Sequence, residues 1–269
     1  MSVAAFHADR AATSPLSRRN PTIKLALVFV VSAVMLFVFD PFTPTVLYLL
    51  ALVGVLAFAR VSPRTLALAH LPFAAFAVGL FVVNVLSRPG QVLWQVGVLR
   101  VTIEGVSVGA ALATRTLLIG ILAIGFLAST GPVALMTSLH QNAHLSARVT
   151  YAILAGYRML QEMPREWETI RHAHAVRAPR GRDNALPRSP RHLSRVIFTL
   201  LVVSVRKGER MAQSLEFRGL GLSPRSTWRP VVIEPADWVF VAAVLAVVGA
   251  VLMASASLGA LEGFGALTN

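Results

Sequence analysis

Two arginines in the second half of the chain stand at the ends of amphipathic patterns. Arg177 follows apolar and aromatic positions spaced three and four residues apart, and the sequence Ala178-Pro179-Arg180-Gly181 then stops the predicted helix. Arg218 ends a similar pattern just before Gly219. Because a guanidinium binds a carboxylate through two parallel hydrogen bonds, each helix end can dock in an acidic groove of a partner protein.

The residues around these arginines form two predicted sets. The helix tips are Val176, Arg177 and Ala178 in the first helix and Phe217, Arg218 and Gly219 in the second. The predicted contact residues leading to them are Trp167, Ile170, His174, Met211 and Ser214. Two simpler interpretations compete with docking. An arginine stabilises the carboxyl end of a helix dipole by about 0.3–1 kcal/mol, and basic helices are attracted to anionic lipid. The duplicated layout favours docking, whereas periodicity alone does not.

Two further arginines, Arg115 and Arg158, interrupt apolar segments. An arginine inside a membrane is costly unless it is paired or faces water, so each is a functional candidate. Arg115 lies near the middle of the apolar stretch 106–127, and Glu104 is too far along the same helix to pair with it. For Arg158, closer to a predicted membrane edge, snorkelling toward water is an equally good interpretation.

Other residue patterns that can support chemistry have simpler explanations here, so no catalytic or metal-binding residue is expected. Gly105-Val106-Ser107-Val108-Gly109 fits the G-x-S-x-G pattern of serine hydrolases, but it opens an apolar helix, where small residues serve close packing. His140 and His144 are four residues apart without a carboxylate nearby, and His172 and His174 point to different helix faces. The chain has no cysteine.

No nucleotide or other cofactor is expected on this chain. Its two lysines are Lys24 and Lys207, and the phosphate-loop sequence G-x-x-x-x-G-K-[ST] is absent. Any ATP and Mg²⁺ must therefore belong to partner subunits.

The composition predicts an all-α, polytopic membrane protein. The 269 residues are 55% hydrophobic and 14% charged, compared with about 25% charged in soluble chains, and the apolar residues fall in long uncharged blocks. Residues 158–229 hold 15 of the 25 Lys and Arg but 6 of the 12 Asp and Glu. This basic block has no aromatic platform for nucleic acid, and basic connections remain in the cytoplasm. Cytoplasmic location of the block is therefore the better interpretation.

The apolar blocks divide the chain into four predicted regions. These are a cytoplasmic tail (1–22), membrane helices 1–4 with their connections (23–150), a cytoplasmic segment of amphipathic helices (151–230), and a last membrane helix with its tail (231–269). The five predicted membrane spans are 25–39, 46–59, 71–86, 106–127 and 238–253. Helices at 131–141 and 146–163 are expected near the cytoplasmic face of the cell membrane, and a further helix is expected from Met163 to Arg177.

At these residues the chain resembles the transmembrane T component of energy-coupling factor transporters, the EcfT/CbiQ/BioN family. The resemblance covers about residues 20–255 and is strongest in 151–177 and 210–219. Val176-Arg177-Ala178 and Phe217-Arg218-Gly219 match the family's two Ala-Arg-Gly signatures at their arginines, although both Ala positions and the first Gly differ. Thr102-Ile-Glu-Gly105 and the helix with Arg115 are also similar.

The resemblance implies a non-catalytic scaffold in the lipid bilayer. In that family the T component joins two cytoplasmic ABC ATPase subunits to a small substrate-binding membrane subunit, for import of vitamins or of cobalt or nickel ions. Arg177 and Arg218 would each dock on one ATPase subunit. Which substrate is carried does not follow, because another subunit binds it.

Two alternative functions remain open from the sequence. One is a stand-alone secondary transporter or channel with Arg115 in the solute path. The other is a membrane-anchored interaction protein whose basic segment binds lipid or regulators.

Overall fold

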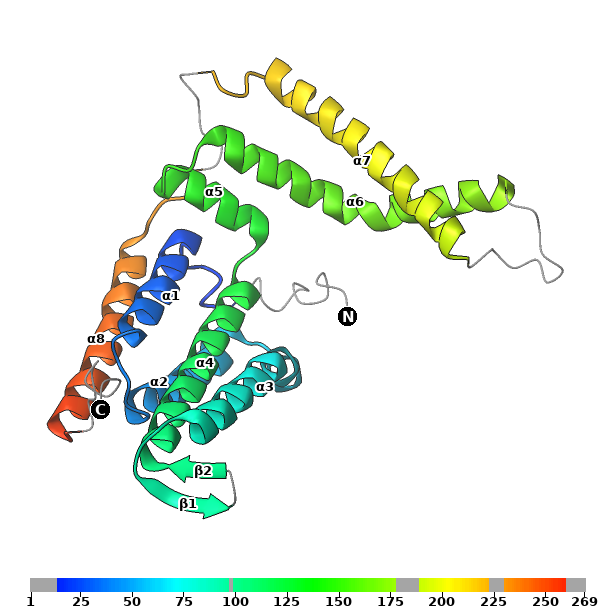
Figure 1. Cartoon of the computed structure of the whole chain (residues 1–269). Coiled ribbons are helices and arrows are strands. Elements are labelled where there is room, and N and C mark those ends of the chain that lie inside the picture. Colours follow the sequence, from blue (N-terminus) through cyan, green and yellow to red (C-terminus); the bar gives the residue numbers. More distant parts are fainter. Residues whose placement is uncertain (1–13, 97–98, 178–188, 223–229, 260–269) are drawn as a thin grey trace. The chain divides into compact units, whose positions relative to one another are not determined.

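The computed structural model describes residues 14–96, 99–177, 189–222 and 230–259 (Figure 1). Within them the chain is almost entirely helical, which confirms the predicted all-α class. The helices are α1 (Pro21–Met35), α2 (Phe42–Ala59), α3 (Pro63–Ser87), α4 (Ile103–Ser129), α5 (Pro132–Asn142), α6 (Ala147–Arg177), α7 (Pro190–Phe217) and α8 (Pro235–Ser257). Described residues of 1–138 and 231–259 form one compact unit, and those of 139–230 form a second.

The first unit contains four helices that are long and apolar enough to cross a membrane, namely α2, α3, α4 and α8. Each contains one of the predicted spans. The remaining predicted span, 25–39, becomes α1, which is apolar but ends at Met35 after 15 residues. At 1.5 Å per residue α1 is about 22 Å long, which is shorter than the bilayer hydrocarbon core of about 30 Å.

The core of this unit gathers around α4. Leu118 and Ile121 of α4 are almost fully buried with Met35 of α1, and Val248 of α8 joins the same cluster. Outside the core, large apolar side chains such as Phe76 and Met253 are exposed. An exposed apolar surface of this kind suits helices surrounded by lipid.

A short β-hairpin lies between α3 and α4. Its antiparallel strands are β1 (Val92–Val96) and β2 (Leu99–Thr102), with a bulge between Val92 and Trp94. The sequence analysis expected an all-α chain, so these strands were not foreseen. The hairpin ends where the Thr102 hydroxyl caps α4, accepting a hydrogen bond from the backbone N–H of Gly105.

The second unit contains the pair α6 and α7. The sequence predicted two consecutive helices meeting at Met163, whereas α6 is one helix of 31 residues that continues through Pro164. Proline removes one backbone donor from the helix interior without ending it here. Helix α7 starts at Pro190, where the Ser189 side chain accepts a hydrogen bond from the backbone N–H of His192.

Candidate functional site

Helices α6 and α7 pack against each other in antiparallel directions. The Ser204 hydroxyl lies 3.8 Å from the Met163 sulfur, and farther along α6 the His174 ring nitrogen Nε2 lies 3.1 Å from the Thr199 hydroxyl. The contact that lies later in α6 thus lies earlier in α7. In an antiparallel pair, the carboxyl ends of the two helices, which carry the predicted tips, lie at opposite ends.

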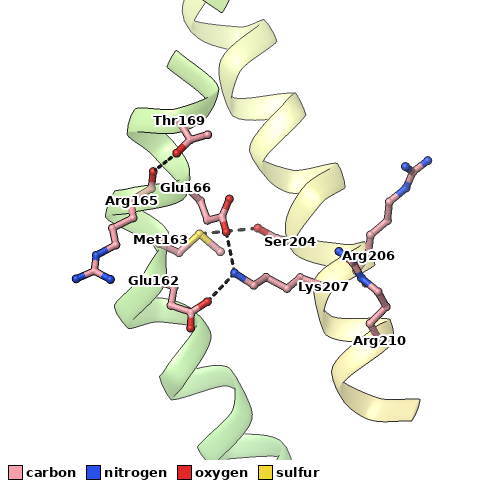
Figure 2. A network of polar contacts seen from close by, with 9 residues as sticks. All are labelled: Glu162, Met163, Arg165, Glu166, Thr169, Ser204, Arg206, Lys207 and Arg210. Carbon is pink, nitrogen blue, oxygen red and sulfur yellow. Dashed lines mark hydrogen bonds and ion pairs between the residues drawn. The ribbon is translucent and has the colours of Figure 1, made fainter. Parts of the chain in front are cut away.

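An ion-pair network joins the two helices at the end of their contact that lies toward the carboxyl end of α7. The Lys207 ammonium of α7 donates to the carboxylates of Glu162 and Glu166 of α6, with N–O distances of 2.6 and 2.7 Å (Figure 2). The glutamates are four residues apart and thus share one face of α6. We call these three residues the Lys207 clasp.

The clasp changes the titration of Glu162 and Lys207. Hydrogen bonding to Lys207, reinforced by its charge, lowers the pKa of Glu162. Hydrogen bonding to Glu162 and then to Glu166 raises the pKa of Lys207. Both shifts favour the charged forms, so Glu162 and Lys207 are ionised around neutral pH. The sequence analysis did not identify the clasp, although two glutamates at i and i+4 and a lysine in a chain with two lysines are visible signals.

The tip of α7 has a geometry that depends on glycine. Helix α7 ends at Phe217, Arg218 is the C-cap, and Gly219 has a φ of 84°. The Gly219 N–H donates to the Glu216 carbonyl and the Leu220 N–H to the Leu215 carbonyl, which is the Schellman arrangement. The Phe217 side chain is 90% exposed, so no described residue of this chain covers it. The tip is therefore accessible to a partner protein.

The described part of α6 reaches the predicted tip. Arg177 is the last residue of α6 and is exposed, and the side chain of Val176 is 87% exposed. Ala178, the third residue predicted for this tip, lies outside the described residues. An exposed apolar residue beside an exposed arginine recurs at both helix ends, as Val176-Arg177 and as Phe217-Arg218.

The predicted contact residues divide between the helix interface and the surface. Ile170 is 7% exposed, and His174 contacts Thr199 and packs edge-to-face against His192 of α7. His174 therefore joins the two helices. The remaining contact residues are more accessible: Trp167 and Met211 are half-buried and Ser214 is exposed.

The partner of Arg115, which the sequence could not identify, is a backbone carbonyl. Its Nη2 donates to the Val38 carbonyl, and its guanidinium carbon lies 5.2 Å from the centroid of the Phe39 ring. Glu104 instead accepts a hydrogen bond from the Gln91 backbone. Arg115 thereby fastens the connection between α1 and α2 to α4. Arg158 is exposed on α6, which is not among the four helices that can span a membrane.

Comparison with known proteins agrees with these features. The model of the CbiQ family, described as cobalt transport protein, matches residues 12–228. This chain belongs to the CbiQ cobalt transport protein family. The match confirms the resemblance read from the two tips. It includes both tips and all of α6 and α7.

A protein of Bifidobacterium longum (strain NCC 2705) is also similar to this CbiQ family member. It carries the provisional name ABC transporter ATP-binding protein, and it is 25% identical over 251 residues. The alignment covers 90% of this chain and 32% of that protein, so the chain spans about a third of the length of its relative.

The remaining candidate motifs have structural explanations in this CbiQ family member. Ser107 lies inside α4 rather than on a turn, and the glycines that flank it pack against α3. A Cβ on Gly105 would lie 2.9 Å from the Asn84 carbonyl oxygen, and one on Gly109 would lie 3.1 Å from that of Phe81. Among the described residues, no group of three or more His, Asp or Glu is placed to hold a metal ion.

Proposed function

We propose that this chain is the membrane scaffold of an energy-coupling factor importer, linking two cytoplasmic ABC ATPase subunits to a small substrate-binding membrane subunit. The observation that carries the proposal is the pair of exposed arginine tips at opposite ends of α6 and α7. Membership of a transport family and likeness to a relative named for ATP binding support it further.

The positions of the tips suit two separate docking sites. Glu166 and Lys207, which pair in the clasp, each precede the arginine of their own helix by eleven residues. Eleven residues of helix measure about 16 Å, so antiparallel helices that meet at this pair place the tips roughly 30 Å apart. In the proposed complex each tip occupies a groove on a different ATPase subunit, where carboxylates pair with the guanidinium and the neighbouring Val176 or Phe217 makes apolar contact.

Motion is then transmitted mechanically. When ATP binding draws the two ATPase subunits together, the grooves approach each other and the tips must follow. Because the clasp joins α6 to α7, movement at the tips changes the angle between the helices. That change is passed to the substrate-binding subunit. No bond is made or broken on this chain, and ATP and Mg²⁺ remain on the ATPase subunits.

The proposed orientation places the amino terminus and the α6–α7 unit in the cytoplasm. The excess of Lys and Arg in residues 158–229 supports this orientation, because basic connections are retained on that side. The proposed substrate is a vitamin or a transition-metal ion, and the family description favours the metal.

The double variant Arg177→Glu with Arg218→Glu tests the docking step. Loss of one buried charge partner costs about 2–5 kcal/mol, so copurification of the ATPase subunits should fall at least tenfold and uptake should be lost. The matched control, Arg158→Glu with Arg206→Glu, makes the same charge change on exposed residues of the same helices. It should retain the ATPase subunits. Normal copurification with the tip variant would contradict the proposal.

A solute path through Arg115 is less well supported, because its guanidinium is engaged by Val38 and Phe39. Liposomes that contain the purified chain alone distinguish the two functions. They should accumulate no cobalt, nickel or vitamin under our proposal.

A further inference from the structure

The first unit contains a long apolar groove between α1, α2, α4 and α8. Its volume is about 620 Å³, and nearly all of its lining is aliphatic or aromatic. On α8 the lining residues recur every three or four positions from Ala236 to Val248, so they occupy one face of that helix. All of the lining residues belong to the first unit.

The dimensions of the groove suit one lipid chain. From Ala236 to Val248 the helix rises about 18 Å, which is close to the depth of one leaflet, about 15 Å of hydrocarbon. An acyl chain of one leaflet's length can therefore lie along the apolar lining of the groove.

One end of the groove is positively charged. Arg19 and Lys24 line it there, and within the part of the chain that the structure describes no acidic residue does. Lys24 is buried, and its ammonium donates to the Leu16 and Ser129 carbonyls and lies 3.3 Å from the Ser129 hydroxyl. Arg19 lies 3.9 Å from the carboxylate of Asp237.

The acidic groups at this end lie beside the groove and not in its lining. Asp237 is the acidic partner of Arg19, and both of its carboxylate oxygens already accept backbone hydrogen bonds, from Asn20 and Glu234. The Glu234 side chain accepts a hydrogen bond from the backbone N–H of Asp237, so a second carboxylate lies close by. Because Arg19 and Lys24 line the groove and neither carboxylate does, an anion inside the groove meets cationic side chains.

We propose that the groove binds one anionic phospholipid, with an acyl chain lying along α8 and the phosphate beside Arg19. Arg19 can supply this contact because its side chain is 28% exposed and its ion pair with Asp237 is long. The inference depends on the membrane location of the first unit and not on ATPase docking. It can therefore hold or fail independently of the proposed function.

The test is photo-crosslinking of the full chain in nanodiscs. The probes are phosphatidylglycerol and phosphatidylcholine analogues that carry a diazirine on the acyl chain. The phosphatidylglycerol probe should label peptides of α1, α2 and α8 that line the groove, and the phosphatidylcholine probe should label them several-fold less. Arg19→Gln should reduce phosphatidylglycerol labelling about tenfold, the effect of losing one charge-assisted hydrogen bond.

Two glycines provide a matched pair of variants. A side chain added at Gly54 projects into open space in the groove, and one added at Gly79 of α3 projects into open space outside it. Gly54→Leu should abolish labelling of the groove, and Gly79→Leu should not change it. Ala243→Phe fills the same groove from α8 and gives a second reading if Gly54→Leu fails to fold.

Three results would overturn the proposal. Equal labelling by both lipids would show that the groove does not select the lipid by the charge of its headgroup. Labelling that persists in Gly54→Leu and Ala243→Phe would place the lipid elsewhere. Groove labelling that disappears when the chain is assembled with its partner subunits would show that a protein occupies the groove.

Discussion

Glu166 of α6 and Lys207 of α7 form a 2.7 Å ion pair that lies eleven residues before the arginine at the end of each helix. The two helix segments beyond this pair are therefore equal in length. A rotation of α6 against α7 at the pair moves both tips by similar amounts, which suits docking to two equivalent ATPase subunits. The clasp thus has a positioning role in the proposed mechanism although it lies far from both tips.

Removing the clasp lysine should loosen the crossing without removing the tips. In Lys207→Met the apolar stem is kept and both ion pairs are lost. We expect ATPase subunits to copurify normally while uptake falls several-fold relative to ATP hydrolysis.

The distance between the tips can be measured with spin labels at Val176→Cys and Phe217→Cys, because the chain has no cysteine of its own. The distribution of this distance should broaden in Lys207→Met. Arg206→Met, the neighbouring cation outside the clasp, is the control, and an unchanged distribution in Lys207→Met would exclude the positioning role.

The pH dependence of the clasp follows from its shifted pKa values. Glu162 has a pKa lowered from 4.5, so its contribution is complete above that value and is lost as the pH falls through the lower, folded-state pKa. Lys207 has a pKa raised from 10.5, so its contribution is complete below that value and is lost only at higher pH. The tip distance should thus stay constant from about pH 5 to pH 10.

The same spin-labelled protein checks this range. The distance distribution should broaden only in acid, as the pH falls well below 4.5, and high salt should broaden it at neutral pH because the clasp is partly exposed. A change centred near neutral pH would show that a group outside the clasp controls the tip distance.

The left-handed Gly219 predicts a specific loss at the second tip. Alanine at a φ of 84° costs roughly 1–2 kcal/mol, so Gly219→Ala should disturb the Schellman turn and weaken ATPase association about tenfold. Gly208→Ala is the matched control: it lies inside α7 with open space around its Cβ position, and there alanine should stabilise the helix by about 0.5–1 kcal/mol. The measurements are ATPase copurification and thermal unfolding of each variant. Equal ATPase retention by both variants would show that docking tolerates a distorted tip.

The features that the sequence predicted correctly are set by residues close together in the chain. The end of α7 was foreseen because an arginine followed by glycine is visible within a few positions. The clasp and the partner of Arg115 depend on contacts between residues far apart in the chain. Arg115 binds a backbone carbonyl 77 positions away, which no side-chain pattern encodes. The sequence analysis also did not predict that α6 continues through Pro164. Proline disfavours the interior of a helix, but in α6 it does not end the helix.

The role of Arg115 can be separated from a solute path by comparing stability with transport. Arg115→Met keeps the apolar stem and removes the hydrogen bond to Val38 and the contact with Phe39, which should cost about 1–3 kcal/mol and lower Tm by several degrees. The control is Arg64→Met, an exposed arginine in the first turn of α3, which should leave Tm unchanged. In the reconstituted complex, uptake per folded Arg115→Met molecule should stay near that of the unmodified chain, because the arginine fastens the α1–α2 connection and does not contact cargo. A variant with normal Tm and no uptake would reverse this assignment and favour the solute path.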